Sequence, residues 1–140
     1  MSVRLQIIPN LRYDDAPAAI DFLCQAFGFT EHAVFRDDTD PSIVSHAQLR
    51  FGDQLIMLAS AVASEWATDA PLKTVKQAGG NTQSLYLVVD DVDGHAERAR
   101  AAGADIFMPP RDQDYGGRGY GARDPEGNAW SFGSYDPWAG

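Results

Sequence analysis

The chain has 140 residues and a formal net charge of −9, from 11 basic and 20 acidic side chains. Its 44% hydrophobic and 22% charged residues exclude a disordered chain, and the shortage of clustered Lys and Arg argues against nucleic-acid binding. The single cysteine, Cys24, excludes a disulfide framework. No apolar run reaches membrane-spanning length, and MSVRLQIIPN lacks the apolar core of a signal peptide, so we expect a cytoplasmic protein that contacts no membrane.

The first predicted helix follows the Asp14-Asp15 pair, where an aspartate can accept hydrogen bonds from the free N–H groups of the first turn. Gly28 suits the left-handed conformation at its end. Apolar residues recur along this helix at spacings of four, three and four, which predicts one buried face: Ala16, Ile20, Leu23 and Phe27.

Three strands are predicted after this helix, at His32–Arg36, Ser45–Phe51 and Gln54–Leu58. A linker from Ala59 to Thr82 follows and contains a predicted short helix and the flexible Gly79-Gly80 pair.

The second half repeats the first. LVVDDVDGHAERARAAGAD echoes LRYDDAPAAIDFLCQAFGF, and the two aspartate pairs begin 76 positions apart, at Asp14 and Asp90. The second helix is expected to bury Val92, Ala96 and Ala99 and to end at Gly103. Three strands again follow, at Asp105–Met108, Arg118–Arg123 and Asn128–Ser134.

The repeat therefore predicts an α+β fold of two β-α-β-β-β modules in one domain, 1–140. Module one takes residues 1–60, the linker 61–81 and module two 82–140. We expect curled mixed sheets around a shared cavity with the helices outside.

Alternation in the strand Ser45–Phe51 divides its side chains between two faces. Ala47, Leu49 and Phe51 form the apolar set, which belongs under the helix, so His46, Gln48 and Arg50 face the opposite way. We expect that opposite face to line the cavity.

The paired modules, with FLCQAFGF after the first helix and RDPEGNAWSFGSY at the end, resemble the vicinal oxygen chelate superfamily. This group includes glyoxalase I, extradiol dioxygenases, and fosfomycin- and bleomycin-resistance proteins. The resemblance implies a cavity that two chains often complete, and in the enzymes a divalent metal held by four His and Glu side chains.

The four positions that the resemblance assigns to metal ligands carry no suitable donor here. They are Ile8, Ser84, Ser131, and either Ile56 or Leu58, depending on the register. An aliphatic side chain is no ligand and a serine hydroxyl is a poor one, so we expect no metal or other cofactor. Of the three histidines, His95 is expected to face solvent, His32 begins a strand, and only His46 lies on the cavity face.

The run Gly116-Gly117-Arg118-Gly119-Tyr120-Gly121 precedes a strand rather than a helix, so it is not a phosphate loop. It is interpreted either as a flexible loop at the cavity mouth or as a structural hairpin. Trp66 and Trp138 are candidates for a dimer contact or a cavity lid, Trp130 for the core, and Cys24 for a buried thiol.

Two functions remain open. The first is a binding protein without metal that sequesters a cationic or aromatic compound and works as a homodimer. The second is a lyase, isomerase or dioxygenase with an unusual ligand set, or with His46 as its general base. The predicted ligand-binding residues are His46, Gln48, Arg50, Ser84, Tyr86, Tyr115, Tyr120 and Ser131.

Overall fold

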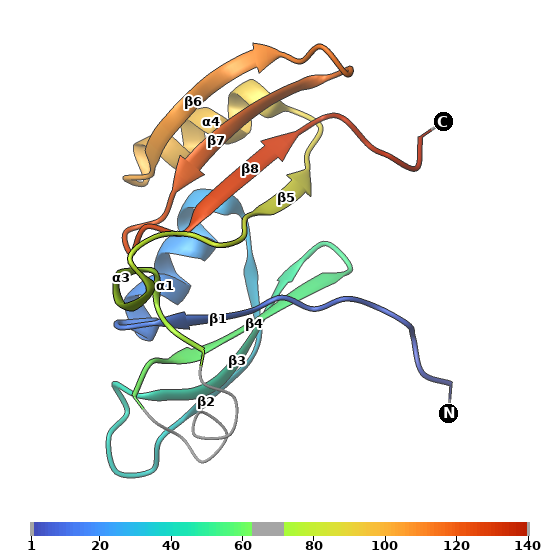
Figure 1. Cartoon of the computed structure of the whole chain (residues 1–140). Coiled ribbons are helices and arrows are strands. Elements are labelled where there is room, and N and C mark those ends of the chain that lie inside the picture. The colour runs from blue at the N-terminus through green and yellow to red at the C-terminus, as the bar shows by residue number, and fades with distance from the viewer. Residues whose placement is uncertain (1, 63–71, 140) are drawn as a thin grey trace.

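The computed structural model describes residues 2–62 and 72–139, in which two modules follow one another along the chain (Figure 1). In chain order the elements are β1 (Asn10–Tyr13), α1 (Ala16–Phe22), the π-helix η1 (Leu23–Phe27), β2 (Thr30–Arg36), β3 (Val44–Phe51), β4 (Gln54–Ser60), α3 (Val75–Ala78), β5 (Leu85–Val88), α4 (Val92–Ala101), β6 (Asp105–Asp112), β7 (Arg118–Arg123) and β8 (Ala129–Gly133).

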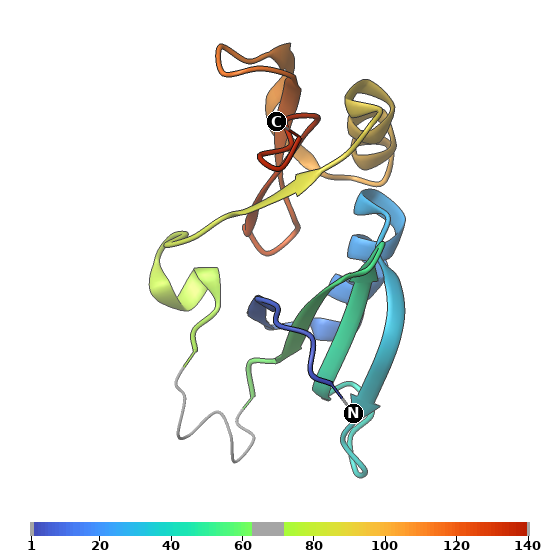
Figure 2. The same ribbon diagram turned by 90° about the vertical axis from the view of Figure 1, so that its right-hand side faces the viewer.

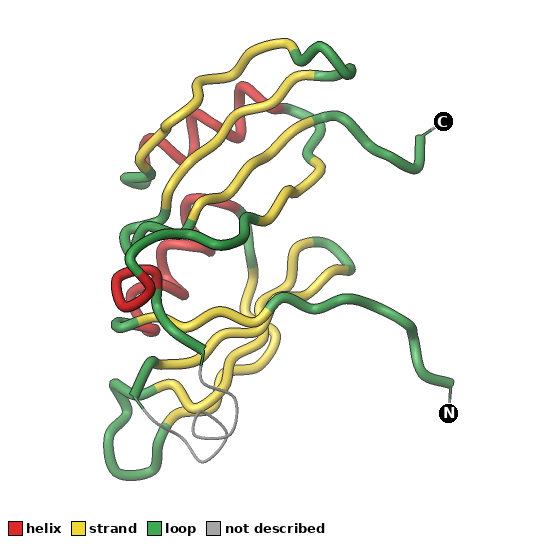
Figure 3. The backbone as a smooth tube through the Cα atoms, in the orientation of Figure 1, coloured by secondary structure: helices red, strands yellow, loops and turns green. Residues whose placement is uncertain are grey.

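Each module contains one four-stranded mixed sheet. The strand order is β1-β4-β3-β2 in the first and β5-β8-β7-β6 in the second. In both sheets the first strand pairs in parallel with the last, and the remaining pairs are antiparallel. The predicted fold class is confirmed. The linker helix is α3, the short helix in the connection between the modules (Figure 3), and the turned view shows it apart from both sheets (Figure 2).

The helix of the first module has the buried face that the sequence predicts. Ala16, Ile20, Leu23 and Phe27 are all buried. Regular α-helix ends at Phe22 and continues as one turn of π-helix, which Gly28 closes with φ of 89°.

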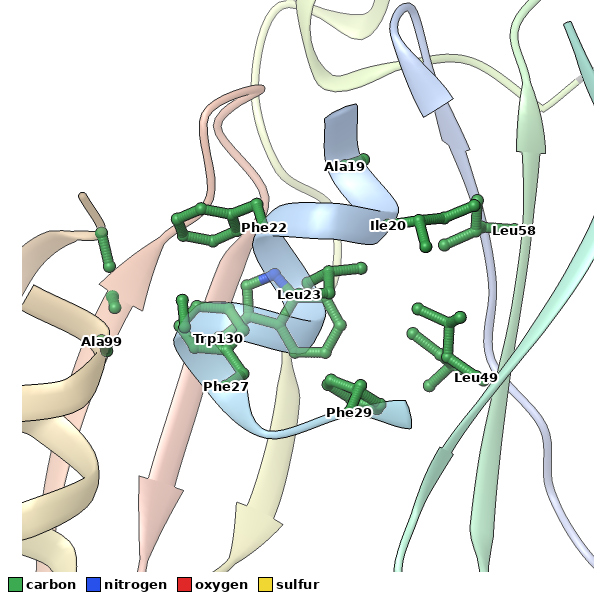
Figure 4. Packing of buried hydrophobic residues seen from close by; sticks show 14 of the residues in the cluster. Ala19, Ile20, Phe22, Leu23, Phe27, Phe29, Leu49, Leu58, Ala99 and Trp130 are labelled. Atoms are coloured by element: carbon green, nitrogen blue, oxygen red, sulfur yellow. The ribbon is translucent and has the colours of Figure 1, made fainter. Parts of the chain in front are cut away.

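The two modules share one hydrophobic core. The ring of Phe27 lies 4.7 Å from that of Phe132 and 5.5 Å from that of Trp130, both on β8 of the other module. Figure 4 shows η1 between the first sheet and β8, with Ala99 of α4 on the far side. Separating the modules would expose the rings of Phe27, Trp130 and Phe132 to water.

A buried carboxylate, that of Asp124, ties the last hairpin to the first strand. Its Oδ2 accepts hydrogen bonds from the hydroxyl of Tyr13 (2.7 Å) and from Nε1 of Trp130 (3.1 Å). Its Oδ1 accepts from the backbone N–H groups of Glu126 and Asn128, each at 3.0 Å. Burial, reinforced by Asp124, raises the pKa of Tyr13, which therefore stays a neutral donor.

Side chains of the second module cap both ends of the first module's helix. The carboxylate of Glu126 accepts from the backbone N–H groups of Asp14 (2.6 Å) and Asp15 (2.9 Å). At the other end Arg98 donates to the carbonyl of Gln25 (2.9 Å) and to that of the preceding residue (3.0 Å). An anion at a helix N-terminus and a cation at its C-terminus are the favourable arrangement.

No helix within 2–62 and 72–139 has both the length and the apolar character needed to cross a bilayer. The first sheet ends at Ser60 and the second begins at Leu85.

Replacing Asp124 with Ala is expected to lower the free energy of unfolding by about 3 kcal/mol, because the buried donors of Tyr13 and Trp130 lose their acceptor. Urea denaturation followed by circular dichroism measures the change. Asp38→Asn, at an exposed carboxylate between β2 and β3, is the control and should stay within about 0.5 kcal/mol of the unchanged protein. Equal stabilities would contradict the role of Asp124.

Candidate functional site

A pocket of about 800 Å³ lies between the two modules. Residues 51–56 at the β3–β4 hairpin form one wall and the edge strand β5 forms the other. The terminal segments complete it with Ile7, Pro9 and Asp136–Trp138, and both extend from the body on the same side (Figure 1). Its volume lies within the range of small-molecule sites, roughly 300–1,000 Å³.

The pocket has apolar walls and an acidic character. Phe29 and Phe51 pack 5.4 Å apart on one side, and Leu85 and Leu87 face them from β5. The charged residues of its lining are both aspartates, and no Lys, Arg or His belongs to the lining formed by the described residues. An uncharged or positively charged apolar molecule suits such walls better than an anion does.

The C-terminal segment is held beside β5 by tyrosines. The hydroxyl of Tyr86 donates to the carbonyl of Tyr135 (2.7 Å), and burial raises the pKa of Tyr86. The ring of Tyr115 meets that of Tyr135 edge-on at 5.1 Å. The backbone N–H of Trp138 donates to Oδ1 of Asp136 (2.9 Å), and the Trp138 side chain is 94% exposed beside the pocket. Trp66 lies outside the described residues.

His46, Gln48 and Arg50 share the face of the first sheet opposite the helix, in the alternation that the sequence predicts. A side-chain nitrogen of Gln48 lies 3.1 Å from Nε2 of His46, whose ring stacks on that of Phe35 at 6.2 Å. Arg50 donates to the carbonyl of Gly52. None of the three lines the pocket.

On the corresponding face of the second sheet, two exposed aromatic rings rest on glycines. A side chain on Gly121 would place its Cβ 2.4 Å from Cζ of Phe107, and one on Gly133 would lie 2.6 Å from the hydroxyl of Tyr86. Ser131 lies beside Tyr86 in the parallel β5–β8 pair. Because neither glycine has a positive φ, the close approach of the rings, rather than the backbone, requires them.

Two expected placements differ in the structure. Tyr120, expected on the cavity, is buried on the helix side of its sheet, and His95, expected in solvent, is half-buried beneath it. Nδ1 of His95 and the hydroxyl of Tyr120 are 2.6 Å apart. The prediction for His95 is wrong because η1 of the other module packs against α4, a long-range contact that local periodicity does not encode.

One of the four positions assigned to metal ligands by the resemblance also differs from the expectation. Asn10 and Tyr86 are equivalent positions, 76 residues apart, in the two halves of the repeat. Asn10 pairs with Met57 and Tyr86 pairs with Ser131, so Met57 is the counterpart of Ser131. Ile56 and Leu58 are buried on the opposite face, so neither expected register was right.

The resulting set is Ile8, Met57, Ser84 and Ser131. A thioether and two hydroxyls do not match the imidazole and carboxylate donors that divalent metals take in this fold, so the residues do not fit that metal. No three His, Cys, Asp or Glu side chains in 2–62 and 72–139 lie close enough together to hold a metal ion.

Cys24 is half-buried on η1. Burial raises the pKa of its thiol, and the nearby carboxylates of Glu31 and Asp21 raise it further. Such a thiol is a poor nucleophile at neutral pH.

The fold and the site's position define a protein of two β-α-β-β-β modules with a pocket at their junction. A family model described as the Glyoxalase/Bleomycin resistance protein/Dioxygenase superfamily matches residues 6–132. The chain belongs to this superfamily.

Individual relatives agree. An uncharacterized protein of Mycobacterium bovis is 33% identical over 133 residues, covering 95% of this chain and 85% of the relative. The crystal structure of TioX from Micromonospora sp. ML1 has a TM-score of 0.71 and 33% identity over 93% of this chain and 98% of TioX. A glyoxalase/bleomycin resistance protein/dioxygenase family enzyme from Burkholderia phytofirmans PsJN has a TM-score of 0.64 and 25% identity over 89% of this chain and 93% of that one.

Sequence reasoning missed most of the pocket. Of the predicted ligand-binding residues only Tyr86 lines it, while Phe29, Phe51 and the two rim aspartates, Asp53 and Asp136, were not proposed. The sequence feature that could have indicated the pocket is the turn at Asp53, an acidic turn beside the aromatic Phe51. That this turn lies opposite β5 depends on how the modules pack, which the sequence pattern does not give.

We expect untagged protein to purify with substoichiometric nickel, zinc and iron, measured by elemental analysis. The double variant Ser84→His, Ser131→Glu should not gain stoichiometric metal, because Ile8 and Met57 still supply no hard donor and such sites need three or four ligands. Stoichiometric metal in the unsubstituted protein, lost on chelation together with an activity, would contradict this.

Proposed function

We propose that this protein binds and sequesters a small organic cation with an aromatic or aliphatic body, without a metal, in the pocket between its modules. The observation that carries the proposal is the pocket lining, which combines apolar walls with Asp53 and Asp136 and lacks a basic side chain among the described residues.

Electrostatics favours a cation in this place. Charges interact more strongly beside apolar walls than in bulk water, and the net charge of −9 raises the local concentration of cations. Phe51, Tyr86 and Trp138 belong to the lining, and aromatic rings attract cations. Arg4 opposes this effect in part, because its guanidinium donates to the backbone carbonyl of Asp53.

The superfamily description supports a sequestering role, because it includes bleomycin resistance proteins. It also includes glyoxalases and dioxygenases, so a lyase, isomerase or dioxygenase is the competing function. The donor set Ile8, Met57, Ser84 and Ser131 weighs against the metal-dependent form of that function.

We also propose that the protein acts as a homodimer. Val3, Leu5 and Ile7 alternate along the extended N-terminal segment and are 85%, 96% and 93% exposed. Apolar surface so open to water marks an interaction surface, and the edge strands β1 and β5 beside it have one unpaired side each.

The ligand class is tested by calorimetry at low salt with three compounds that share one naphthyl ring and differ in charge. They are the cation 1-naphthylmethyl-trimethylammonium, the neutral 1-naphthylmethanol and the anion 1-naphthylmethanesulfonate. We expect the cation to bind best and the anion worst. Asp136→Asn should weaken the binding of the cation about fivefold, which corresponds to a loss of about 1 kcal/mol of binding free energy, and should leave the binding of the alcohol unchanged. Asp38→Asn is the matched control. Equal binding of cation and anion, or binding of none, would refute the proposal.

Light scattering at micromolar concentration is expected to return twice the 15.2 kDa of one chain. Replacing Leu5 and Ile7 together with Asp should shift the protein to a single chain, because a buried interface does not tolerate unpaired carboxylates. Val62→Asp, at another exposed apolar residue, controls for added charge. A 15.2 kDa species in the unsubstituted protein contradicts the dimer.

A further inference from the structure

His95 on α4 connects the two modules through both nitrogens of its ring. Nε2 lies 2.8 Å from the carbonyl oxygen of Phe27 at the end of η1, and Nδ1 lies 2.6 Å from the hydroxyl of Tyr120 on β7. The ring also contacts Phe132 at 4.4 Å and Phe51 at 6.5 Å. His95 therefore contacts β7 and β8 of its own module and η1 and β3 of the other.

These partners fix the proton on the ring. A carbonyl oxygen only accepts, so Nε2 of His95 carries the hydrogen that Phe27 receives. Nδ1 is then the acceptor for the hydroxyl of Tyr120, whose pKa burial raises well above its ordinary value. In the neutral imidazole both hydrogen bonds form together, and the hydrogen of the Tyr120 hydroxyl has Nδ1 as its acceptor.

A second proton would bind to Nδ1, which then no longer accepts the hydrogen of the Tyr120 hydroxyl. Tyr120 is completely buried, so its hydrogen would have to find another acceptor in the core. The imidazolium would also be held among the rings of Phe27, Phe51 and Phe132.

Among the residues that the structure describes, the charged and titratable groups around His95 offer the imidazolium no anion. From its own helix the nearby charge is the cation of Arg98, and β7 contributes the neutral hydroxyl of Tyr120. The partners from η1, β3 and β8 are a carbonyl and apolar rings. Burial lowers the pKa of His95 most; the Phe27 carbonyl opposes this, and Arg98 lowers the pKa further.

The junction that His95 stabilises also positions the two walls of the pocket, which belong to different modules. Phe51, which the His95 ring touches, is a pocket wall, and Phe29 beside it lies two residues beyond the Phe27 carbonyl. The opposite wall, β5, belongs to the module of His95. The distance between the walls therefore depends on how firmly the modules are joined.

We infer that His95 is a positioning residue that makes the pocket pH-sensitive: the neutral ring locks the two walls together, and protonation loosens the junction and releases the ligand. This rests on the proposed function for the ligand, but the lock itself is measurable without one.

The first measurement is the unfolding equilibrium without ligand between pH 8 and pH 5, by urea titration. The folded state holds the extra proton less well than the unfolded chain, so stability is full above the ordinary histidine pKa of about 6.5 and falls as the pH drops below it. We expect the unfolding constant to rise about fivefold more in the unsubstituted protein than in His95→Gln. The glutamine keeps an amide donor and an acceptor but does not titrate, and His32→Gln, at an exposed histidine, is the control and should retain the full rise.

The second measurement is the dissociation constant of 1-naphthylmethyl-trimethylammonium, whose charge does not change with pH. We expect about threefold weaker binding at pH 5.5 than at pH 7.5 in the unsubstituted protein and in Asp136→Asn, and little change in His95→Gln. A pH response that Asp136→Asn removes would assign the effect to the rim carboxylate and overturn the inference.

The outcomes separate the two claims. An equal pH dependence of stability in the unsubstituted protein and His95→Gln overturns the lock, whatever the pocket binds. A stability difference as expected, with no probe bound at any pH, supports the lock and overturns the proposed ligand.

Discussion

The fold depends on the helix of the first module being capped by the second. A helix leaves free N–H groups at its start and free carbonyls at its end, and each costs energy if it is buried without a partner. Here Asp15 accepts the N–H of Ala18 in the first turn, and Glu126 of the other module accepts the N–H groups of Asp14 and Asp15 just before it. Arg98 and His95, also of the other module, bind carbonyls at the end. The same helix carries the apolar face that both sheets bury. Separating the modules would therefore expose both its polar ends and its apolar side.

The turn that carries Glu126 gives a structural reason for the RDPEGN segment, one of the features on which the resemblance to the superfamily rests. Asp124 opens the turn, folds it by accepting the backbone N–H groups of Glu126 and Asn128, and receives the hydroxyl of Tyr13. Once the turn has this shape, the Glu126 carboxylate lies at the start of α1. Pro125 and Gly127 permit the turn, and the two acidic residues of the motif join the modules.

Local features of the fold followed from the sequence because they depend on neighbouring residues. The faces of α1 and β3, the aspartate caps and the glycine after η1 all need only a few positions of sequence. Features that depend on pairing between distant segments did not follow. Met57, rather than Ile56 or Leu58, corresponds to Ser131 because the β1–β4 register sets the face. Tyr120 is buried because it lies on the helix side of its sheet, against His95 of α4 and Phe132 of β8. The pocket combines a hairpin, an edge strand and both terminal segments, which no single pattern links.

The capping of one module's helix by the other also makes the two halves of the repeat unequal. At the 76-residue offset, His95 and Arg98 of the second helix correspond to Ala19 and Phe22 of the first, which are buried apolar residues. The first module's hairpin turns through Gly52 and Asp53 alone, without room for a counterpart of Asp124. The two halves therefore have different roles, one presenting a helix and the other binding its ends, so a protein built from two copies of either half would lack one side of the junction.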